Sequence, residues 1–260
     1  MDATLAQLLL AVLSGGVVAL LLTVFGGGGS VLAVPLQLYV VGVRDPHVAI
    51  GASAAGVALN ALTALAGHAR AGRVRWPCAL LFAGAGSLGA LAGSSVAKAI
   101  DGQVLLLFFA FAMGLVGLAM LRPNAPVGAE GVRLTRAMAP RIAASGAGVG
   151  VAAGFFGIGG GFLIVPGLMG AAGMTLALAQ ASSLVSVAAF GAATAANYAV
   201  SGLIDWPIVA AMALGGGVGT LAGLPIARRL GANAVLGRRL FAGLILIVAV
   251  YVAIRAISAL

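Results

Sequence analysis

The sequence predicts an all-α polytopic membrane protein with about eight full transmembrane helices, two short re-entrant or broken helices and two inverted-topology repeats. Three observations carry this prediction. Hydrophobic residues make up 62% of the 260 residues and charged residues only 7%, whereas a soluble domain carries about a quarter charged residues. The apolar residues gather in runs near the length of a membrane span. A glycine-rich motif and a Trp-Pro motif each occur twice, in the same order.

The composition also limits the classes of function. A mean hydropathy of +1.20 makes the lipid bilayer the solvent, and long unbroken apolar runs favour helices over a barrel. The net charge is +9, but the basic residues lie between apolar runs, so we expect no nucleic-acid partner. Cys78 is the only cysteine, which excludes an intrachain disulfide. No His/Cys cluster has metal-ligand spacing, and we expect neither a metal nor a cofactor.

Apolar segments separated by charged residues, Pro or Gly are the expected helices. Runs near 20 residues can cross a hydrocarbon core of about 30 Å, whereas a dozen residues cannot. The N-terminus has no basic n-region, so the first run is expected to be a span and not a cleaved signal peptide. The expected long segments are 5–24, 47–67, 76–98, 103–121, 141–156, 176–198, 206–228 and 240–257, and the short ones are 30–43 and 161–172.

A polar linker divides the chain into an N-terminal membrane repeat, 1–121, a cytoplasmic linker, 122–140, and a C-terminal inverted repeat, 141–260. The first repeat reads F-G-G-G-G-S-V-L-A-V-P at 25–35, and the second reads F-G-I-G-G-G-F-L-I-V-P at 156–166. Farther on, G-R-V-R-W-P at 72–77 matches G-L-I-D-W-P at 202–207. The spacing between motifs differs by one residue. Two matched motifs in the same order indicate an internal duplication.

The basic residues predict the orientation in the membrane. Three loops are rich in arginine, and the positive-inside rule places all three in the cytoplasm. Both termini are then outside, each glycine run lies where the chain doubles back, and the two halves are inverted. Inverted repeats with interrupted segments at matching positions are typical of secondary transporters. The arginines concerned are Arg70, Arg73 and Arg75; Arg122, Arg133, Arg136 and Arg141; and Arg228, Arg229, Arg238 and Arg239.

The two glycine runs predict an anion site. Each run opens a short helix, whose first N–H groups are unpaired and carry the positive end of the helix dipole. Inversion would aim the two helix N-termini at each other near the midplane, where backbone groups alone could bind an anion. The alternative is that these glycines serve only close helix packing. The candidate residues are Gly27, Gly28, Gly29, Ser30, Gly159, Gly160 and Gly161.

Polar side chains within the spans extend this candidate site. Ser53 and Asn60 follow the first short segment, and Ser182, Ser183 and Ser186 follow the second. Ser53 aligns with Ser183, and Ser182 shares a helix face with Ser186. The alternative for each serine is a bond to the carbonyl four residues earlier. Asn60 is costly to bury without a partner.

These motifs resemble the sulfite exporter TauE/SafE family of bacterial membrane transporters. The resemblance rests on the glycine-rich runs that lead into Pro35 and Pro166 and on the later Gly-x-x-x-Trp motif, and it covers essentially the whole chain. It differs at Ser30, where the other half has Gly161. The resemblance implies export of sulfite or of an organosulfur anion such as a sulfonate, across a bacterial inner membrane.

The predicted function is therefore secondary transport of a small anion, and a selective anion channel is the alternative. No Lys, Arg, Asp or Glu falls in the middle of a span, which disfavours a carboxylate proton relay. An intramembrane serine protease is disfavoured because Ser30 has no histidine deep in a span to activate it; we expect no catalytic residue and no enzyme. The sequence leaves open which anion is moved, in which direction, with which coupling ion, and whether the chain forms a homodimer.

Overall fold

A computed structural model describes residues 4–121, 128–129, 131–157, 161–230 and 234–258, and in this part of the chain all regular structure is helical. The fold class predicted from the sequence is confirmed at this level. The elements are α1 (Leu5–Phe25), the 3₁₀ helix η1 (Gly26–Leu32), α2 (Ala33–Leu36), the π-helix η2 (Gln37–Val41), α3 (Pro46–Arg70), α4 (Trp76–Ala97), α5 (Gly102–Leu121), α6 (Ala139–Phe156), α7 (Gly161–Ala172), α8 (Leu176–Val200), α9 (Trp206–Leu230) and α10 (Ala234–Ile257).

Within the described residues, six helical stretches are long and apolar enough to cross a membrane. The chain is therefore a multi-pass membrane protein, whereas a count of eight crossings stays a prediction. α7 and the apolar part of α10, Ala242–Ile257, are shorter. The six stretches are Leu5–Val41, Pro46–Arg70, Trp76–Ala97, Gly102–Ala119, Leu176–Val200 and Trp206–Ala227.

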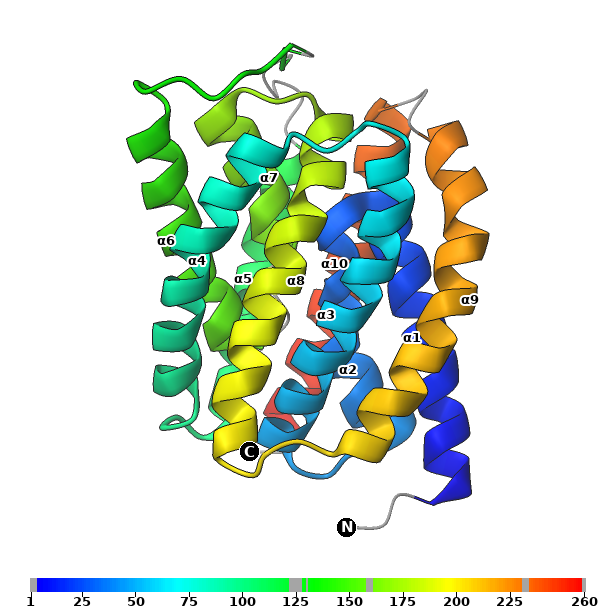
Figure 1. Cartoon of the computed structure of the whole chain (residues 1–260). Helices are drawn as coiled ribbons and strands as arrows, with labels where there is room; N and C mark the ends of the chain where they lie inside the picture. The colour runs from blue at the N-terminus through cyan, green and yellow to red at the C-terminus, as the bar shows by residue number, and fades with distance from the viewer. Residues whose placement is uncertain (1–3, 122–127, 130, 158–160, 231–233, 259–260) are drawn as a thin grey trace.

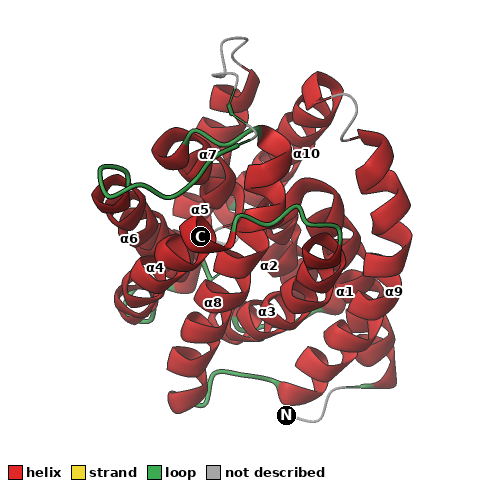
Figure 2. Cartoon of the chain, turned by 45° about the horizontal axis from the view of Figure 1, so that its top comes forward, coloured by secondary structure: helices red, strands yellow, loops and turns green. Residues whose placement is uncertain are grey.

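The helices form one bundle in which long helices pack in pairs (Figures 1 and 2). α1 packs along α9, and α4 packs along α6, because glycines let the backbones approach closely. A Cβ added at Gly215 would overlap the Val12 carbonyl, and one at Gly93 would overlap the Val151 carbonyl. α3 packs on α8, and α5 packs on α10.

Aspartates cap three of the helices that begin at the lower end of Figure 1, α3, α5 and α9. The Asp45 carboxylate accepts from the His47 N–H at 2.7 Å, the Asp101 carboxylate from the Gln103 N–H at 2.9 Å, and the Asp205 carboxylate from the Ile208 N–H at 3.2 Å. These caps satisfy N–H groups that have no partner within a helix. The acids at this end are therefore explained by local helix structure.

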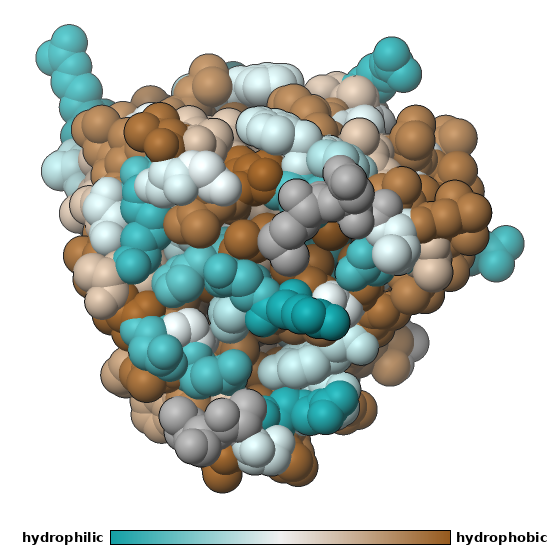
Figure 3. Space-filling view, turned by 90° about the horizontal axis from the view of Figure 1, so that it is seen from below, coloured by the Kyte–Doolittle hydropathy of each residue, from teal (hydrophilic) through white to brown (hydrophobic). Residues whose placement is uncertain are grey.

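The two ends of the bundle differ in charge. The loop between α3 and α4, residues 131–138 before α6, the end of α9 and the start of α10 all lie at the upper end in Figure 1, as the charge pattern predicted. The opposite end carries a band of hydrophilic side chains across its middle (Figure 3). Apolar side chains such as Leu13, Leu88, Phe111, Leu214 and Ile247 are exposed on the sides of the bundle, where lipid would cover them.

The first short segment differs from its prediction in extent and shape. The chain turns back at Gly26, because α1 and α3 both begin at the lower end (Figure 1). The helical return starts within the glycine run and reaches Val41, whereas the sequence predicted residues 30–43. Pro35, which has no N–H to donate, precedes the change from α2 to the wider turns of η2.

Candidate functional site

The first glycine turn lies directly on the second half of the chain. α1 ends at Gly26, whose φ of 64° and ψ of −147° suit glycine and few other residues. A Cβ at this position would overlap the backbone of Gln180 in α8. Glycine is therefore required here both by backbone conformation and by close contact.

The second glycine turn makes the equivalent contact. α6 ends at Gly157 with a φ of 65°, and a Cβ there would overlap the side chain of Ile50 in α3. Ile50 and Gln180 correspond in the repeat alignment and occupy the same place relative to Pro46 and Leu176, where their helices begin. Each turn is thus seated near the start of a long helix of the other half.

Three of the predicted site residues are joined by hydrogen bonds at the first turn. The Gly27 N–H donates to Ser183 Oγ at 2.8 Å, and Ser183 Oγ donates to the Gln180 carbonyl at 2.7 Å. Ser30 Oγ donates to the Gly27 carbonyl at 2.9 Å. All of these residues except Gln180 are buried. The expectation that every early N–H of this segment is unpaired is therefore wrong for Gly27.

The second half presents only part of its predicted site. Gly159 and Gly160 lie outside the described residues, and Gly161 begins α7. Ser53, the counterpart of Ser183, is fully buried, and its Oγ has no hydrogen-bond partner in the described structure. The corresponding hydroxyls of the two halves are thus in different states.

The remaining first-half glycines are packed between helices. Gly28 and Gly29 are buried. A Cβ at Gly29 would overlap the backbone of Leu21 and Leu22, so η1 returns in close contact with α1. η1 also packs against α7 and α8. The two short segments therefore run side by side in the interior of the bundle.

The two turns do not face each other at the midplane. α3 and α8 are antiparallel, since Gly51 abuts Tyr198 while Gly191 abuts Ala54 and Ala58. Ile50 consequently lies level with Tyr198, and the stretch of α8 from Gln180 to Tyr198 rises about 27 Å. The prediction that both turns lie at the midplane is wrong, because α1 and α6 each run most of the way through the bundle before they end. The turns lie nearer opposite ends, and the short segments pass each other between them.

Ser182 and Ser186, which were predicted to share a helix face, lie in different surroundings. Ser182 Oγ accepts from the Arg75 N–H at 2.9 Å, in the connection between α3 and α4. Ser186 is fully buried and its Oγ has no hydrogen-bond partner in the part of the chain described. Ser182 therefore anchors a loop, whereas Ser186 keeps a free hydroxyl in the interior.

Asn60 belongs to a separate polar group between α1, α3 and α9. Its Nδ2 donates to the Gly15 carbonyl at 3.2 Å, and a Cβ at Gly216 would overlap its Oδ1. One helical turn farther on, the Thr63 and Thr220 hydroxyls lie 3.1 Å apart. Asn60 is thus held by helix contacts, and no hydrogen bond in the described structure joins it to the glycine turns.

Sequence reasoning missed Gln37, which lies on η2. The side chain is fully buried, its Nε2 lies 2.7 Å from Met212 Sδ, and its Oε1 has no partner among the described residues. A glutamine within an otherwise apolar short segment was the available signal. It places one more polar group on the segment that carries Gly27 and Ser30.

The first short segment is broken into η1, α2 and η2, carries the buried Ser30 and Gln37, and lies beside α7 within the multi-pass bundle. A broken helical segment inside a membrane bundle is a feature of membrane transporters. The comparisons agree: the family model for the sulfite exporter TauE/SafE matches residues 11–252. The chain belongs to this family of membrane transporters.

Proteins similar to the chain carry names consistent with this class. Two proteins from Xylella fastidiosa, strains 9a5c and Temecula1, are each called "Probable membrane transporter protein" and are 46% identical over 250 residues, which is 96% of this chain and 96% of theirs. A probable membrane transporter protein of Bacillus subtilis is 26% identical over 197 residues, 73% of this chain and 77% of its own. No solved structure matches the chain.

Proposed function

We propose that this protein is a secondary transporter that moves a small sulfur oxyanion, sulfite or an organosulfur anion such as a sulfonate, across a bacterial inner membrane. The observation that carries the proposal is the exchange of glycine turns, in which Gly26 is seated on Gln180 and Gly157 on Ile50. Both turns have a glycine with positive φ, 64° at Gly26 and 65° at Gly157, and each belongs to one half while resting on the other. Such an arrangement lets a change in one half alter the site of the other.

The packing pattern supports two inverted repeats. In the repeat alignment, α1 corresponds to α6 and α4 to α9. The pairs α1 with α9 and α6 with α4 therefore exchange with each other, while α3 packs on its counterpart α8 and α5 on its counterpart α10. A pseudo-twofold axis between the halves accounts for all four pairs. Domain boundaries at 1–121, 122–140 and 141–260 follow from this account.

The proposed anion path runs where η1 and α7 pass each other. At one end, the Gly27 N–H and Ser183 form a half-site in which the serine oxygen occupies the acceptor position. At the other, Ser53 keeps an unpaired hydroxyl, and the start of α7 at Gly161 supplies backbone N–H groups. We assign the paired half-site to the closed state and the unpaired one to the state ready for the anion. Transport would exchange the two states.

The chemistry of this path favours a weakly held oxyanion. No Lys, Arg, Asp or Glu lies in the middle of a span, so N–H and hydroxyl donors and helix dipoles would neutralise the charge. Each helix-terminus contact contributes only about 0.3–2 kcal/mol. An oxyanion with several acceptor oxygens can use many such donors at once. Modest affinity, shared between both halves, is the consequence.

The test is counterflow in vesicles. Purified protein is reconstituted, loaded with unlabelled sulfite, and diluted into radioactive sulfite. A carrier takes up label transiently above the level of empty vesicles, and uptake saturates with concentration. A conductance that does not saturate and shows no counterflow would assign the protein to anion channels. Absence of any sulfite or sulfonate movement would reject the proposed substrate class.

A further inference from the structure

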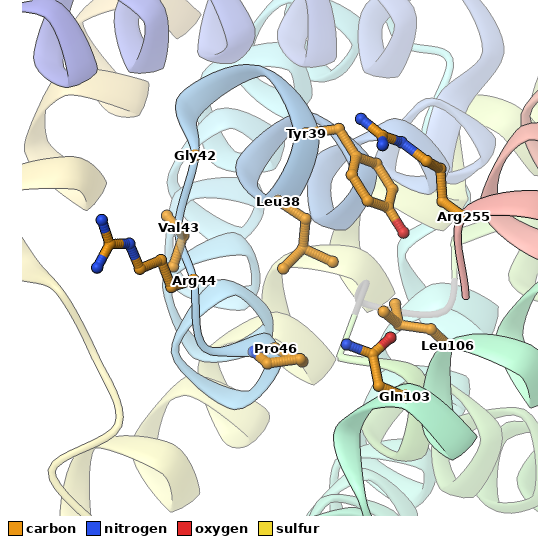
Figure 4. Close-up of a pocket in the computed structure, with 9 residues that line it drawn as sticks. All are labelled: Leu38, Tyr39, Gly42, Val43, Arg44, Pro46, Gln103, Leu106 and Arg255. Carbon is orange, nitrogen blue, oxygen red and sulfur yellow. The ribbon is translucent and has the colours of Figure 1, made fainter. Parts of the chain in front are cut away.

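A cavity of about 220 Å³ opens at the end of the bundle opposite the basic loops. It lies between η2, the loop that follows η2, the start of α5 and the end of α10 (Figure 4). Its polar lining consists of Tyr39, Arg44, Gln103 and Arg255, and none of the carboxylates that the structure describes lines it. The cavity is therefore positively charged, although most of the basic residues lie at the other end of the bundle.

Arg255 lies at the edge of this cavity beside two tyrosines. Its Cζ lies 5.3 Å from the centre of the Tyr39 ring and 5.9 Å from that of Tyr251, and its Nε donates to Tyr251 Oη at 3.4 Å. The two rings meet edge to face, with centres 5.3 Å apart. These contacts hold the guanidinium beside the rings and leave its terminal N–H groups for another acceptor.

Neutral donors line the same cavity. Figure 4 shows Tyr39, Gln103 and Arg255 on one side of the cavity, with the Arg255 guanidinium beside the Tyr39 ring at the edge, whereas the guanidinium of Arg44 points away on the other side of the loop. A planar guanidinium at the edge of a cavity that is also lined by amide and hydroxyl donors suits an oxyanion, which can accept two parallel bonds from arginine. Four or five heavy atoms need on the order of 100 Å³, if each takes about the volume of a water molecule, so the cavity is large enough.

We propose that this cavity is an external binding site for the transported oxyanion, with Arg255 as its principal contact and with Tyr39 and Gln103 completing the set of donors. The inference rests on the proposed function. Tyr39 belongs to η2, in the same helical return that begins at the first glycine turn. An anion at Arg255 is thus bound by the segment whose other end carries Gly27 and Ser30, which gives it a direct structural connection to the inner path.

The test compares two arginines at the same rim. Arg255→Gln and Arg44→Gln remove the same charge from the same end of the protein, but only Arg255 lies on the same side of the cavity as the donors. Counterflow is measured with radioactive sulfite added outside the vesicles. The orientation of the protein in these vesicles is determined beforehand by cysteine labelling. We expect Arg255→Gln to raise the outer-face KM about tenfold or more with little change in the maximal rate, Arg255→Lys to be intermediate, and Arg44→Gln to change KM less than about twofold.

Several outcomes would overturn the site. Equal effects of Arg255→Gln and Arg44→Gln would reduce both residues to a general surface charge. An unchanged KM in Arg255→Gln, with normal wild-type counterflow, would reject the site and leave the proposed function intact. Loss of stability in Arg255→Gln that an anionic lipid restores, without a change in KM, would assign Arg255 to a lipid headgroup. If Arg255→Gln does not fold, Tyr39→Phe and Gln103→Leu decide, since each removes one donor; normal KM in both rejects the site.

Discussion

Ser183 and Ser53 occupy corresponding positions but are bonded differently, and this difference can be tested residue by residue. Ser183→Ala leaves the buried Gly27 N–H and Gln180 carbonyl without their hydroxyl partner, which costs about 1–3 kcal/mol. We expect a lower thermal midpoint without anion and a larger stabilisation by added sulfite than in the wild type, because the anion can replace the serine oxygen. Ser53→Ala should leave the midpoint nearly unchanged and reduce the stabilisation by sulfite. Thermal unfolding in detergent with and without sulfite measures both.

A purely structural role for these serines makes a different prediction. Ser183→Ala would then be destabilised by the same amount with or without sulfite, and Ser53→Ala would respond to sulfite like the wild type. That pair of results would remove both residues from the anion path.

Gly26 and Gly42 separate backbone strain from close contact. Both have positive φ, 64° and 79°. An alanine in this left-handed conformation costs roughly 1–2 kcal/mol of folding free energy. A Cβ at Gly26 would also overlap the Gln180 backbone, whereas nothing lies within 4 Å of one at Gly42. Gly26→Ala should therefore reduce the yield of monodisperse protein on size exclusion far more than Gly42→Ala. Equal behaviour of the two variants would show that the contact with α8 contributes little.

The sequence identified most of the residues at the turns but could not assign their partners. The glycine runs and the alignment of Ser53 with Ser183 were visible in the repeat. That the Gly27 N–H bonds to Ser183 was not, because this contact joins different halves of the chain. Asn60 shows the same limit. It faces Gly15 and Gly216, whereas its counterpart Phe190 faces Gly86, so matched positions can hold a polar contact in one half and an apolar one in the other.

The packing of α1 on α9 gives a prediction at the scale of helices. Gly219 and Gly217 lie on the same helix, but a Cβ at Gly219 would overlap the Gly16 carbonyl of α1, and one at Gly217 would meet nothing within 4 Å. Gly219→Ala should lower the thermal midpoint by separating the helices. Gly217→Ala should leave it unchanged or raise it, since alanine favours a helix by about 1 kcal/mol over glycine. A stable Gly219→Ala variant would show that the pair tolerates a wider spacing.

At this scale the apolar runs predicted the bounds of the long helices to within three residues, except that α10 begins at Ala234 and not at residue 240. The structure shows in addition that Asp45, Asp101 and Asp205 cap three of the helix starts. The short segments were less predictable. The first glycine run was expected to be a turn before a short helix, but residues 26–32 form a 3₁₀ helix. Contacts with α1, α7 and α8 order this stretch, because a glycine-rich backbone has little conformational preference of its own.

The orientation of the whole molecule is tested by labelling. Ala71 and Ala99 are exposed in loops at opposite ends of the bundle. In a Cys78→Ala background, we expect a membrane-impermeant thiol reagent added to intact cells to label Ala99→Cys and to spare Ala71→Cys until the cells are opened. Labelling of Ala71→Cys in intact cells would reverse the orientation inferred from the arginine-rich loops.

The charge pattern predicted that the arginine-rich loops share one end of the bundle, and the described parts of these loops lie there (Figure 1). The level of the glycine turns could not be predicted from the sequence, because it depends on how far α1 and α6 run through the bundle before they end. The contact of Gly51 with Tyr198 shows that α3 and α8 are antiparallel and that the two turns lie at different levels. The proposed path consequently extends along η1 and α7 and is not confined to one point at the midplane.

The most direct test of this account is to locate a bound anion. Selenite has the charge and shape of sulfite, and its selenium can be identified by anomalous scattering in crystals grown with it. We expect a peak along η1 and α7, within hydrogen-bonding distance of Ser53 or of the glycine-rich starts of these segments, and a weaker peak beside Arg255. Selenium bound only at positions far from both glycine turns, in protein that performs counterflow, would contradict the account.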